Sequence, residues 1–213
     1  MTNTTLQYYN TNADSFIDNT FNADVSTDIH NFIKKVKSGG KILDVGCGSG
    51  RDTLIFKNLG FNVIAFDVSE ELVKKASEKI NHPILHMDMK DISWENEFDG
   101  VWAMASLLHL EKKDFPHILK KVINSVKEDG YLFISLKQGM DSGYDEKGRF
   151  FSYYQKEELE NILKEMNVEN ISFSANKDTL GRDLSWISFI AQKNSLKLLH
   201  QNKNDNNILK RKF

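Results

Sequence analysis

The chain has 213 residues, of which 40% are hydrophobic and 27% are charged, an ordinary composition for a globular protein. One cysteine excludes an internal disulfide and a four-cysteine zinc site, and two prolines exclude a proline-rich stalk. No run approaches the ~20 apolar residues of a membrane helix, and residues 1–10 lack the basic and apolar regions of a signal peptide. We therefore expect a soluble cytoplasmic protein with no membrane partner.

The net charge of the chain is −2, but the C-terminal tail is basic and the rest of the chain is acidic. Residues 195–213 contain five basic side chains and one acidic side chain, so the remainder carries a net charge of −6. An acidic body argues against a broad nucleic-acid-binding surface. We interpret residues 194–213 as a basic, polar tail that is flexible. The alternatives are a contact with RNA or another anionic partner, and a partner helix through Leu196 and Leu199.

Two stripes of apolar residues at helical spacing precede the first glycine cluster. The first runs from Tyr9 to Ile17 and the second from Val25 to Val36, where Ser38-Gly39-Gly40 ends it. We interpret residues 1–37 as an N-terminal helical lid and residues 38–193 as the core domain.

Strands and helices then alternate along the chain. The expected strands are 41–46, 61–66, 83–87, 98–103 and 131–136, and a turn at Asp129-Gly130 precedes the last of them. The expected helices start near Arg51, after the N-cap Ser69 and near Asp114, with one more around 159–166. Two strands at 168–175 and 184–191 have no helix between them, so we expect an antiparallel pair. This pattern predicts an α/β protein with a Rossmann-like, doubly wound sheet that is mostly parallel and has helices on both faces. In such a sheet a ligand lies at the carboxyl ends of the strands.

A glycine-rich turn, Asp44-Val45-Gly46-Cys47-Gly48-Ser49-Gly50, follows the first strand. Glycines let the backbone turn tightly and let a ligand approach closely. The third glycine of the dinucleotide pattern G-x-G-x-x-G is missing in both registers, because position 51 is Arg and position 53 is Thr. This disfavours a nicotinamide-dependent oxidoreductase. The carboxylate of Asp44 would repel a pyrophosphate and suits a cationic group such as an ammonium.

Two more acidic residues follow the next two strands. Asp67 ends the second strand, where a carboxylate can accept hydrogen bonds from a ribose diol. Asp88 follows the third strand and, together with the backbone of Met89, can receive an adenine. A ligand with a cationic end, a ribose and an adenine but no phosphate fits the description of S-adenosylmethionine.

The runs ILDVGCGSGRD, FDVS and MDM resemble the motifs of class I S-adenosylmethionine-dependent methyltransferases over about residues 25–192. The GCGSGRD form and the N-terminal YY helix are most similar to small cytosolic enzymes of the tellurite-resistance-like type. The resemblance implies a seven-stranded sheet with only the last strand antiparallel, and S-adenosylhomocysteine as the product. The candidate cofactor-binding residues are Tyr9, Asp44, Gly46, Cys47, Gly48, Gly50, Arg51, Asp67, Val68, Asp88, Met89, Ala103 and Met104.

Candidate residues for the methyl acceptor follow the fourth and fifth strands. His109 lies where the substrate would meet the methyl group, and its unperturbed pKa of ~6.5 suits a general base. The alternative is a structural histidine. Arg149, Tyr153 and Tyr154 can line a substrate pocket or pack against the following helix. His82 and His86 have no clear third ligand, so we expect no metal site.

The residues after the fourth strand also bear on the acceptor. Neither Asn-Pro-Pro-Tyr nor Asp-Pro-Pro-Tyr occurs there, so methylation of a base amino group is not indicated. The acidic body and the lack of an appended recognition domain favour a small-molecule acceptor, methylated by in-line displacement. The alternatives are a tRNA methyltransferase that uses the basic tail and a non-catalytic S-adenosylmethionine-binding protein. The sequence does not predict the oligomeric state.

Overall fold

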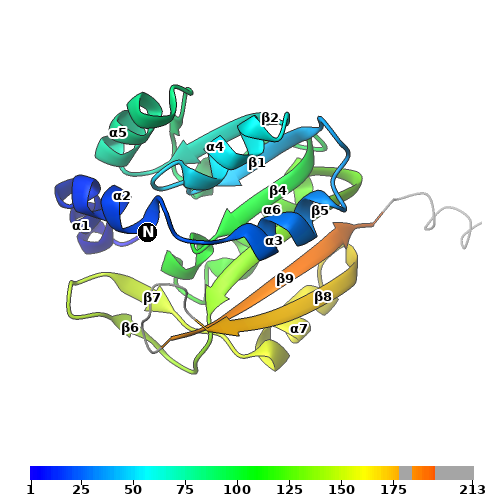
Figure 1. Ribbon diagram of the computed structural model, residues 1–213. Coiled ribbons are helices and arrows are strands. Elements are labelled where there is room, and N and C mark those ends of the chain that lie inside the picture. Colours follow the sequence, from blue (N-terminus) through cyan, green and yellow to red (C-terminus); the bar gives the residue numbers. More distant parts are fainter. Residues whose placement is uncertain (178–183, 195–213) are drawn as a thin grey trace, which may run out of the picture.

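The computed structural model describes residues 1–177 and 184–194, which form a seven-stranded sheet with the strand order β3-β2-β1-β4-β5-β9-β8 (Figure 1). The strands are β1 (Lys41–Val45), β2 (Asn62–Asp67), β3 (Leu85–His86), β4 (Phe98–Met104), β5 (Val126–Lys137), β8 (Val168–Lys177) and β9 (Ser185–Lys193). The first five pair in parallel, whereas β9 is antiparallel to both of its neighbours, β5 and β8. The structure therefore confirms the α/β fold that the sequence predicts.

Helices cover both faces of the sheet (Figure 1). One face packs against α3 (Ser26–Ile33), α4 (Arg51–Asn58) and α5 (Glu70–Ile80), and the other against α6 (Phe115–Ser125) and α7 (Lys156–Lys164). Because successive side chains of a strand point to opposite faces, Ile42 joins the core on the α3–α4 side and Leu43 the core on the α6–α7 side. Asp44, two residues after Ile42, therefore lies on the α4 side of the sheet.

The N-terminal region differs from the expected lid in two ways. The first apolar stripe forms two helices, α1 (Asn3–Thr11) and α2 (Ala13–Thr20), which are separated at Asn12. The backbone oxygen of Tyr8 accepts from the Asn12 backbone amide at 2.9 Å and from the Asn12 side-chain amide at 2.8 Å, so Asn12 closes the end of α1 with two hydrogen bonds. The second stripe, α3, belongs to the core, because Phe32 is fully buried against the sheet. We therefore keep the name lid for α1 and α2 alone, and their role as a lid stays a prediction.

The segment after α6 also differs from expectation. The predicted helix ends at Ser125, and β5 begins at once, because Val126 already pairs with Phe98. The ladder then shifts and resumes at Tyr131, so the expected turn at Asp129 is a bulge within the strand, with φ 63°. Between β5 and α7 lies a hairpin of β6 (Ser142–Tyr144) and β7 (Phe150–Ser152). The sequence did not predict this hairpin.

The expectations for the tail at 194–213 lie outside the described residues, except for Asn194. None of the helices that the structure describes is long and apolar enough to cross a membrane.

Candidate functional site

The glycine turn after β1 forms an open cradle. Gly46 and Gly48 have φ values of 68° and 54°, a region that side-chain-bearing residues rarely adopt. A Cβ at Gly46 would lie 2.6 Å from the Cβ of Ser106, and a Cβ at Gly48 would lie 3.1 Å from the ring of Phe16. Side chains at these two positions would therefore strain the turn and collide with neighbours that face it.

Two adjoining cavities surround this cradle. The larger has a volume of about 480 Å³ and is lined by the ends of β1, β4 and β5, by α2 and by β7. The smaller has a volume of about 50 Å³ and extends toward the ends of β2 and β3. Both share the walls formed by Tyr9, Phe16, Gly46, Gly48, Ala105 and His109. The cavities therefore lie at the carboxyl ends of the parallel strands, as the fold rule requires.

Asp67 lies on the wall of the smaller cavity and is joined to the glycine turn. Its carboxylate accepts hydrogen bonds from the backbone amides of Gly48 and Ser69, each at 2.9 Å. Ser69 also begins α5 and accepts from the Leu72 amide, which confirms the N-cap that the sequence predicts. Burial raises the pKa of Asp67, and the two backbone donors partly oppose this effect.

Asp44 is a second buried carboxyl group, and it lies on the wall of the larger cavity. It accepts a hydrogen bond from the Thr53 hydroxyl at 2.6 Å. Burial, followed by the negative charge of Asp52, raises the pKa of Asp44. A cationic ligand group nearby would reverse this shift, because an opposite charge favours the ionised carboxylate.

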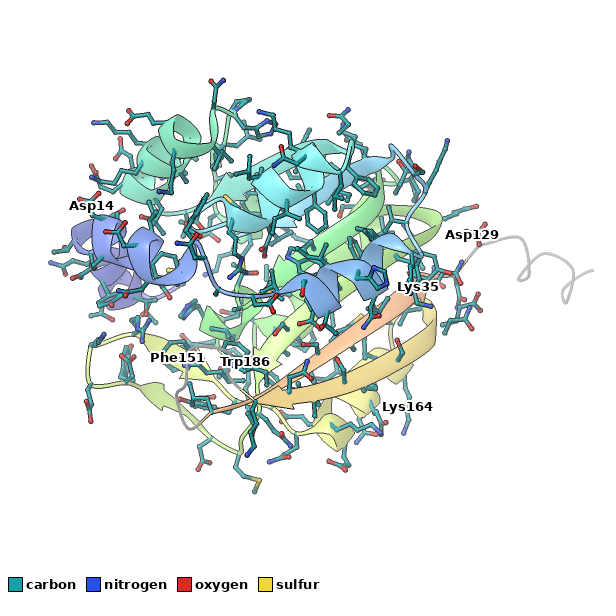
Figure 2. All side chains as sticks on the ribbon, viewed as in Figure 1. Asp14, Lys35, Asp129, Phe151, Lys164 and Trp186 are labelled. Carbon is teal, nitrogen blue, oxygen red and sulfur yellow. The ribbon has the colours of Figure 1, made fainter. Side chains whose placement is uncertain are left out.

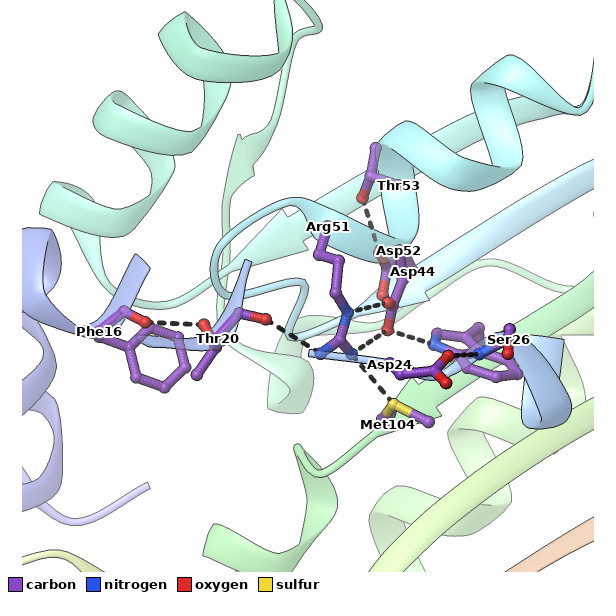
Figure 3. A network of polar contacts seen from close by, with 10 residues as sticks. Phe16, Thr20, Asp24, Ser26, Asp44, Arg51, Asp52, Thr53 and Met104 are labelled. Carbon is purple, nitrogen blue, oxygen red and sulfur yellow. Dashed lines mark hydrogen bonds and ion pairs between the residues drawn. The ribbon is translucent and has the colours of Figure 1, made fainter. Parts of the chain in front are cut away.

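Arg51 connects the start of α4 to the end of α2 (Figure 3). Its guanidinium donates to both carboxylate oxygens of Asp52, at 2.6 and 3.1 Å, and to the backbone oxygen of Thr20 at 3.2 Å. Asp52 also accepts from the indole nitrogen of Trp102 at 2.8 Å. The ion pair at the cavity wall is therefore well hydrogen-bonded, as a buried charge pair must be.

A chain of hydrogen bonds fixes α1 over the cavity. The Tyr9 hydroxyl lies 2.9 Å from Nε2 of His109, and Nδ1 of His109 lies 2.7 Å from the backbone oxygen of Phe150. Because a carbonyl can only accept, Nδ1 carries the proton and Nε2 accepts from Tyr9. The Phe150 amide in turn donates to the Thr5 hydroxyl at 2.8 Å. Both backbone groups of Phe150 are thus used to hold the lid.

The opposite side of α1 is attached to α5. The Ser69 hydroxyl donates to the side-chain oxygen of Asn10 at 2.7 Å. Figure 1 shows α1 and α2 between α5 and the β6–β7 hairpin, at the end of the sheet where the cavities lie. The lid therefore bridges the smaller cavity, bounded by α5, and the larger cavity, bounded by the hairpin.

Burial keeps both partners of the Tyr9–His109 pair uncharged. Desolvation is the main cause of the lowered pKa of His109, about 4, and of the raised pKa of Tyr9, about 12. The pair is therefore a neutral hydrogen bond around pH 7.

The structure brings most of the candidate residues to the two cavities. The larger cavity is lined by Tyr9, Asp44, Gly46, Cys47, Gly48, Arg51, Met104, His109 and Arg149. The smaller cavity adds Asp67, Val68 and Met89. Burial raises the pKa of the Cys47 thiol, so Cys47 is an unreactive wall residue around neutral pH.

Five candidates line neither cavity. Ala103 is buried in the core that packs against α6 and α7, and Gly50 faces the side chain of Ile80. Asp88 caps a short 3₁₀ helix, Met89–Asp91, by accepting from the Lys90 amide at 3.0 Å. Tyr154 is fully buried, 4.8 Å from the ring of Phe115, and Tyr153 packs over Gly139. Both tyrosines pack against other residues, which was the alternative to a place in the substrate pocket, and neither lines the two cavities.

Several wall residues were not identified from the sequence. Ser135 and Lys137 at the end of β5 could have been found, because the fold rule points to every parallel strand end. Phe151 could not, because its place depends on the hairpin of β6 and β7, and Trp186 reaches the cavity through the pairing of β9 with β5, where it lies opposite Lys137 (Figure 2). Within residues 1–177 and 184–194, no group of three or more His, Cys, Asp and Glu side chains could hold a metal ion.

The pKa of His109 predicts a pH dependence of stability. Unfolding returns the imidazole to its ordinary pKa of ~6.5, so the unfolded state binds the proton first and the native state loses stability as the pH falls from 6.5 toward 4. Urea denaturation measures the decrease in the free energy of unfolding between pH 7 and pH 4.5. We expect this decrease to be about 2–3 kcal/mol smaller in His109→Gln than in the wild type. The surface variant His117→Gln should follow the wild type. An equal loss in wild type and His109→Gln would contradict the buried neutral imidazole.

The walls of the cavities fit S-adenosylmethionine. The glycine cradle leaves space beside Asp44 for a cationic group, and Asp67 presents carboxylate oxygens toward the smaller cavity. The buried hydroxyl of Ser106 has no hydrogen-bond partner in the described structure, so it can receive one from a bound group.

Comparison with known proteins agrees with this fit. An uncharacterized methyltransferase of Staphylococcus carnosus is 26% identical over 155 residues, 73% of this chain and 74% of that protein. The S-adenosyl-L-methionine-dependent methyltransferase TehB of Haemophilus influenzae is 26% identical over 112 residues, but this stretch covers only 39% of TehB and 50% of this chain. The fold is shared with 1,6-didemethyltoxoflavin-N1-methyltransferase of Burkholderia thailandensis, solved with 1,6-didemethyltoxoflavin and S-adenosylhomocysteine. The TM-score is 0.71 at 19% identity, over 89% of this chain and 85% of that one.

A family model described as a methyltransferase domain matches residues 18–172, most of the chain. The chain therefore belongs to the methyltransferase domain family and is an S-adenosylmethionine-dependent methyltransferase.

Proposed function

We propose that the methyl acceptor is a small molecule that binds in the 480 Å³ cavity. The observation that carries this proposal is the cover of the cavity, because α1 is hydrogen-bonded to the hairpin at Phe150 and to α5 at Ser69. The volume, which the acceptor would share with part of the cofactor, lies within the roughly 300–1,000 Å³ of small-molecule sites. A cavity of this size beneath a docked helix suits a small molecule better than a polynucleotide.

S-adenosylmethionine supplies a methyl group that is already activated as part of a sulfonium. The task left to this chain is to orient the acceptor and to exclude water. Phe16, Leu108 and Phe151 give the larger cavity apolar walls, whereas Tyr9 and His109 give it a polar edge. Orientation by such walls can account for roughly 7–11 kcal/mol of a reaction barrier.

The contacts of His109 bear on its role in this reaction. A general base needs a free lone pair, and the lone pair of Nε2 accepts from Tyr9. We propose that His109 positions Tyr9 while the lid is closed, and that it can act as a base only when Tyr9 has moved away. While the lid is closed, burial lowers the pKa of His109 to about 4 and keeps the imidazole neutral at pH 7.

The lid contributes directly to cofactor binding in this proposal, because Tyr9 and Phe16 line both cavities. We expect deletion of residues 1–22 to raise the Kd for S-adenosylhomocysteine at least about tenfold and to lower turnover, since two of the shared walls are lost. Titration calorimetry measures the first effect. The matched control is Asp14→Ala, because Asp14 lies on the lid and makes only an exposed ion pair with Lys75 of α5. This variant should leave the Kd unchanged. Unchanged affinity and turnover after the deletion would refute a lid function.

The acceptor class is tested with S-adenosylmethionine labelled in the methyl group. The protein is incubated separately with the small-molecule, RNA and protein fractions of a cell extract, and transferred label is counted in each. We expect label in the small-molecule fraction only, and we expect Asp67→Asn to reduce it because Asp67 faces the cofactor cavity. Label in RNA would support the tail-dependent tRNA alternative and contradict the proposal. Binding of the cofactor without transfer to any fraction would support the non-catalytic alternative.

A further inference from the structure

Ser106 is a buried polar residue without a partner at the edge of the glycine cradle. Its side chain follows β4 and is only 5% exposed, and its hydroxyl makes no hydrogen bond within the described structure. Leaving a buried hydroxyl unpaired costs free energy, so such a group calls for an explanation. Tyr154 and Asn194 also have a buried polar side-chain atom without a hydrogen-bond partner in the described part of the chain, but they line neither of the two cavities.

A strained backbone presents this hydroxyl to the cavity. The preceding residue, Ala105, has φ 52°, a left-handed conformation that is unfavourable for alanine. The turn is held by hydrogen bonds from the Ala105 amide to the Ser135 oxygen, 3.2 Å, and from the His109 amide to the Ser106 oxygen, 3.3 Å. It places Ser106 opposite Gly46, where a Cβ would lie 2.6 Å from its own Cβ. Strain that the surrounding structure holds in place is common where a chain contacts a ligand.

The neighbours of Ser106 in the smaller cavity are already engaged. Asp67 accepts two backbone hydrogen bonds, and both nitrogens of His109 are occupied by Tyr9 and Phe150. The remaining wall residues include apolar side chains such as Met89. The Ser106 hydroxyl therefore retains both its donor and its acceptor capacity at this wall.

We propose that Ser106 is a cofactor-binding residue whose hydroxyl forms its hydrogen bond with the adenosyl part of the cofactor. The inference rests on the methyltransferase assignment and on the position of Ser106 in the cavity that Asp67 and Met89 also line. A hydroxyl can pair with a ring nitrogen of adenine or with a ribose hydroxyl. No described residue pairs with this hydroxyl, so the bound cofactor would be its partner.

This role has a signature that a structural serine would not give. Replacing Ser106 with alanine removes a hydroxyl that no described residue pairs with, so the empty protein should lose no stability. The same change removes a hydrogen bond from the complex, so affinity should fall. The matched control is Ser125, which is fully buried and donates to the Val122 oxygen at 2.7 Å, remote from both cavities. Ser125→Ala should lose stability and keep its affinity.

The test uses the full chain, titration calorimetry and thermal unfolding. For Ser106→Ala we expect the Kd of S-adenosylhomocysteine and of methylthioadenosine to rise about threefold to tenfold, and the Tm of the empty protein to be no lower than that of the wild type. Methylthioadenosine lacks the amino-acid group, so equal losses for both ligands assign the hydrogen bond to the adenosyl part. An unchanged Kd, a lower Tm of the empty protein, or a loss confined to S-adenosylhomocysteine would overturn the proposal. If the wild type bound neither ligand, the cofactor assignment itself would fail.

Discussion

The hydrogen bond from the Gly48 amide to the Asp67 carboxylate joins the turn after β1 to the end of β2. The two strands are parallel neighbours in register, from Lys41 opposite Asn62 to Val45 opposite Phe66, so their carboxyl ends meet at one edge. The bond fixes the glycine turn in its open form and aligns Asp67 with the smaller cavity. The cradle, the acid on its wall and the start of α5 at Ser69 all depend on this connection.

The hydrogen bonds that attach α1 to this framework through Thr5, Tyr9 and Asn10 join uncharged groups, whereas α2 accepts a hydrogen bond from the Arg51 guanidinium at Thr20. Tyr9 and His109 form an uncharged pair because burial opposes the charged form of each. A neutral hydrogen bond contributes about 0.5–1.5 kcal/mol, so several of them hold α1 in place without making its release prohibitive. This balance would suit the proposed lid, which would open for ligands and close for methyl transfer. Arg149, which lines the larger cavity, forms an ion pair with Asp145 at 2.6 Å within the connection between β6 and β7.

Local patterns in the sequence were enough to predict the framework. Alternating apolar strands and helical stripes gave the parallel sheet, and the N-cap at Ser69 was correct because capping depends on neighbouring residues. The glycine turn and Asp67 were also placed at the cavities, because chain direction alone puts strand ends on one edge. Contacts between distant segments could not be predicted in this way. The Tyr9–His109 pair joins residues 100 positions apart, and it depends on the break at Asn12 and on the hairpin at Phe150.

The predicted site residues that line neither cavity also show that a strand end alone does not determine where a side chain points. Tyr154 follows β5 in sequence, but the hairpin turns it into the core beside Phe115. Ala103 lies at a strand end, but the alternation of side chains points it to the opposite face, whereas Met104 points to the cavity. A strand end therefore identifies a neighbourhood, and the direction of each side chain decides which residue in it contacts a ligand.

The most direct measurement is a crystal structure of the full chain with S-adenosylhomocysteine. We expect the ligand in the glycine cradle between Gly46 and Asp67, with its ribose hydroxyls hydrogen-bonded to the Asp67 carboxylate and α1 closed over it. The remaining space beside His109 and Phe151 should stay open for an acceptor. Density for the ligand elsewhere, or a ribose out of hydrogen-bond reach of Asp67, would contradict the account.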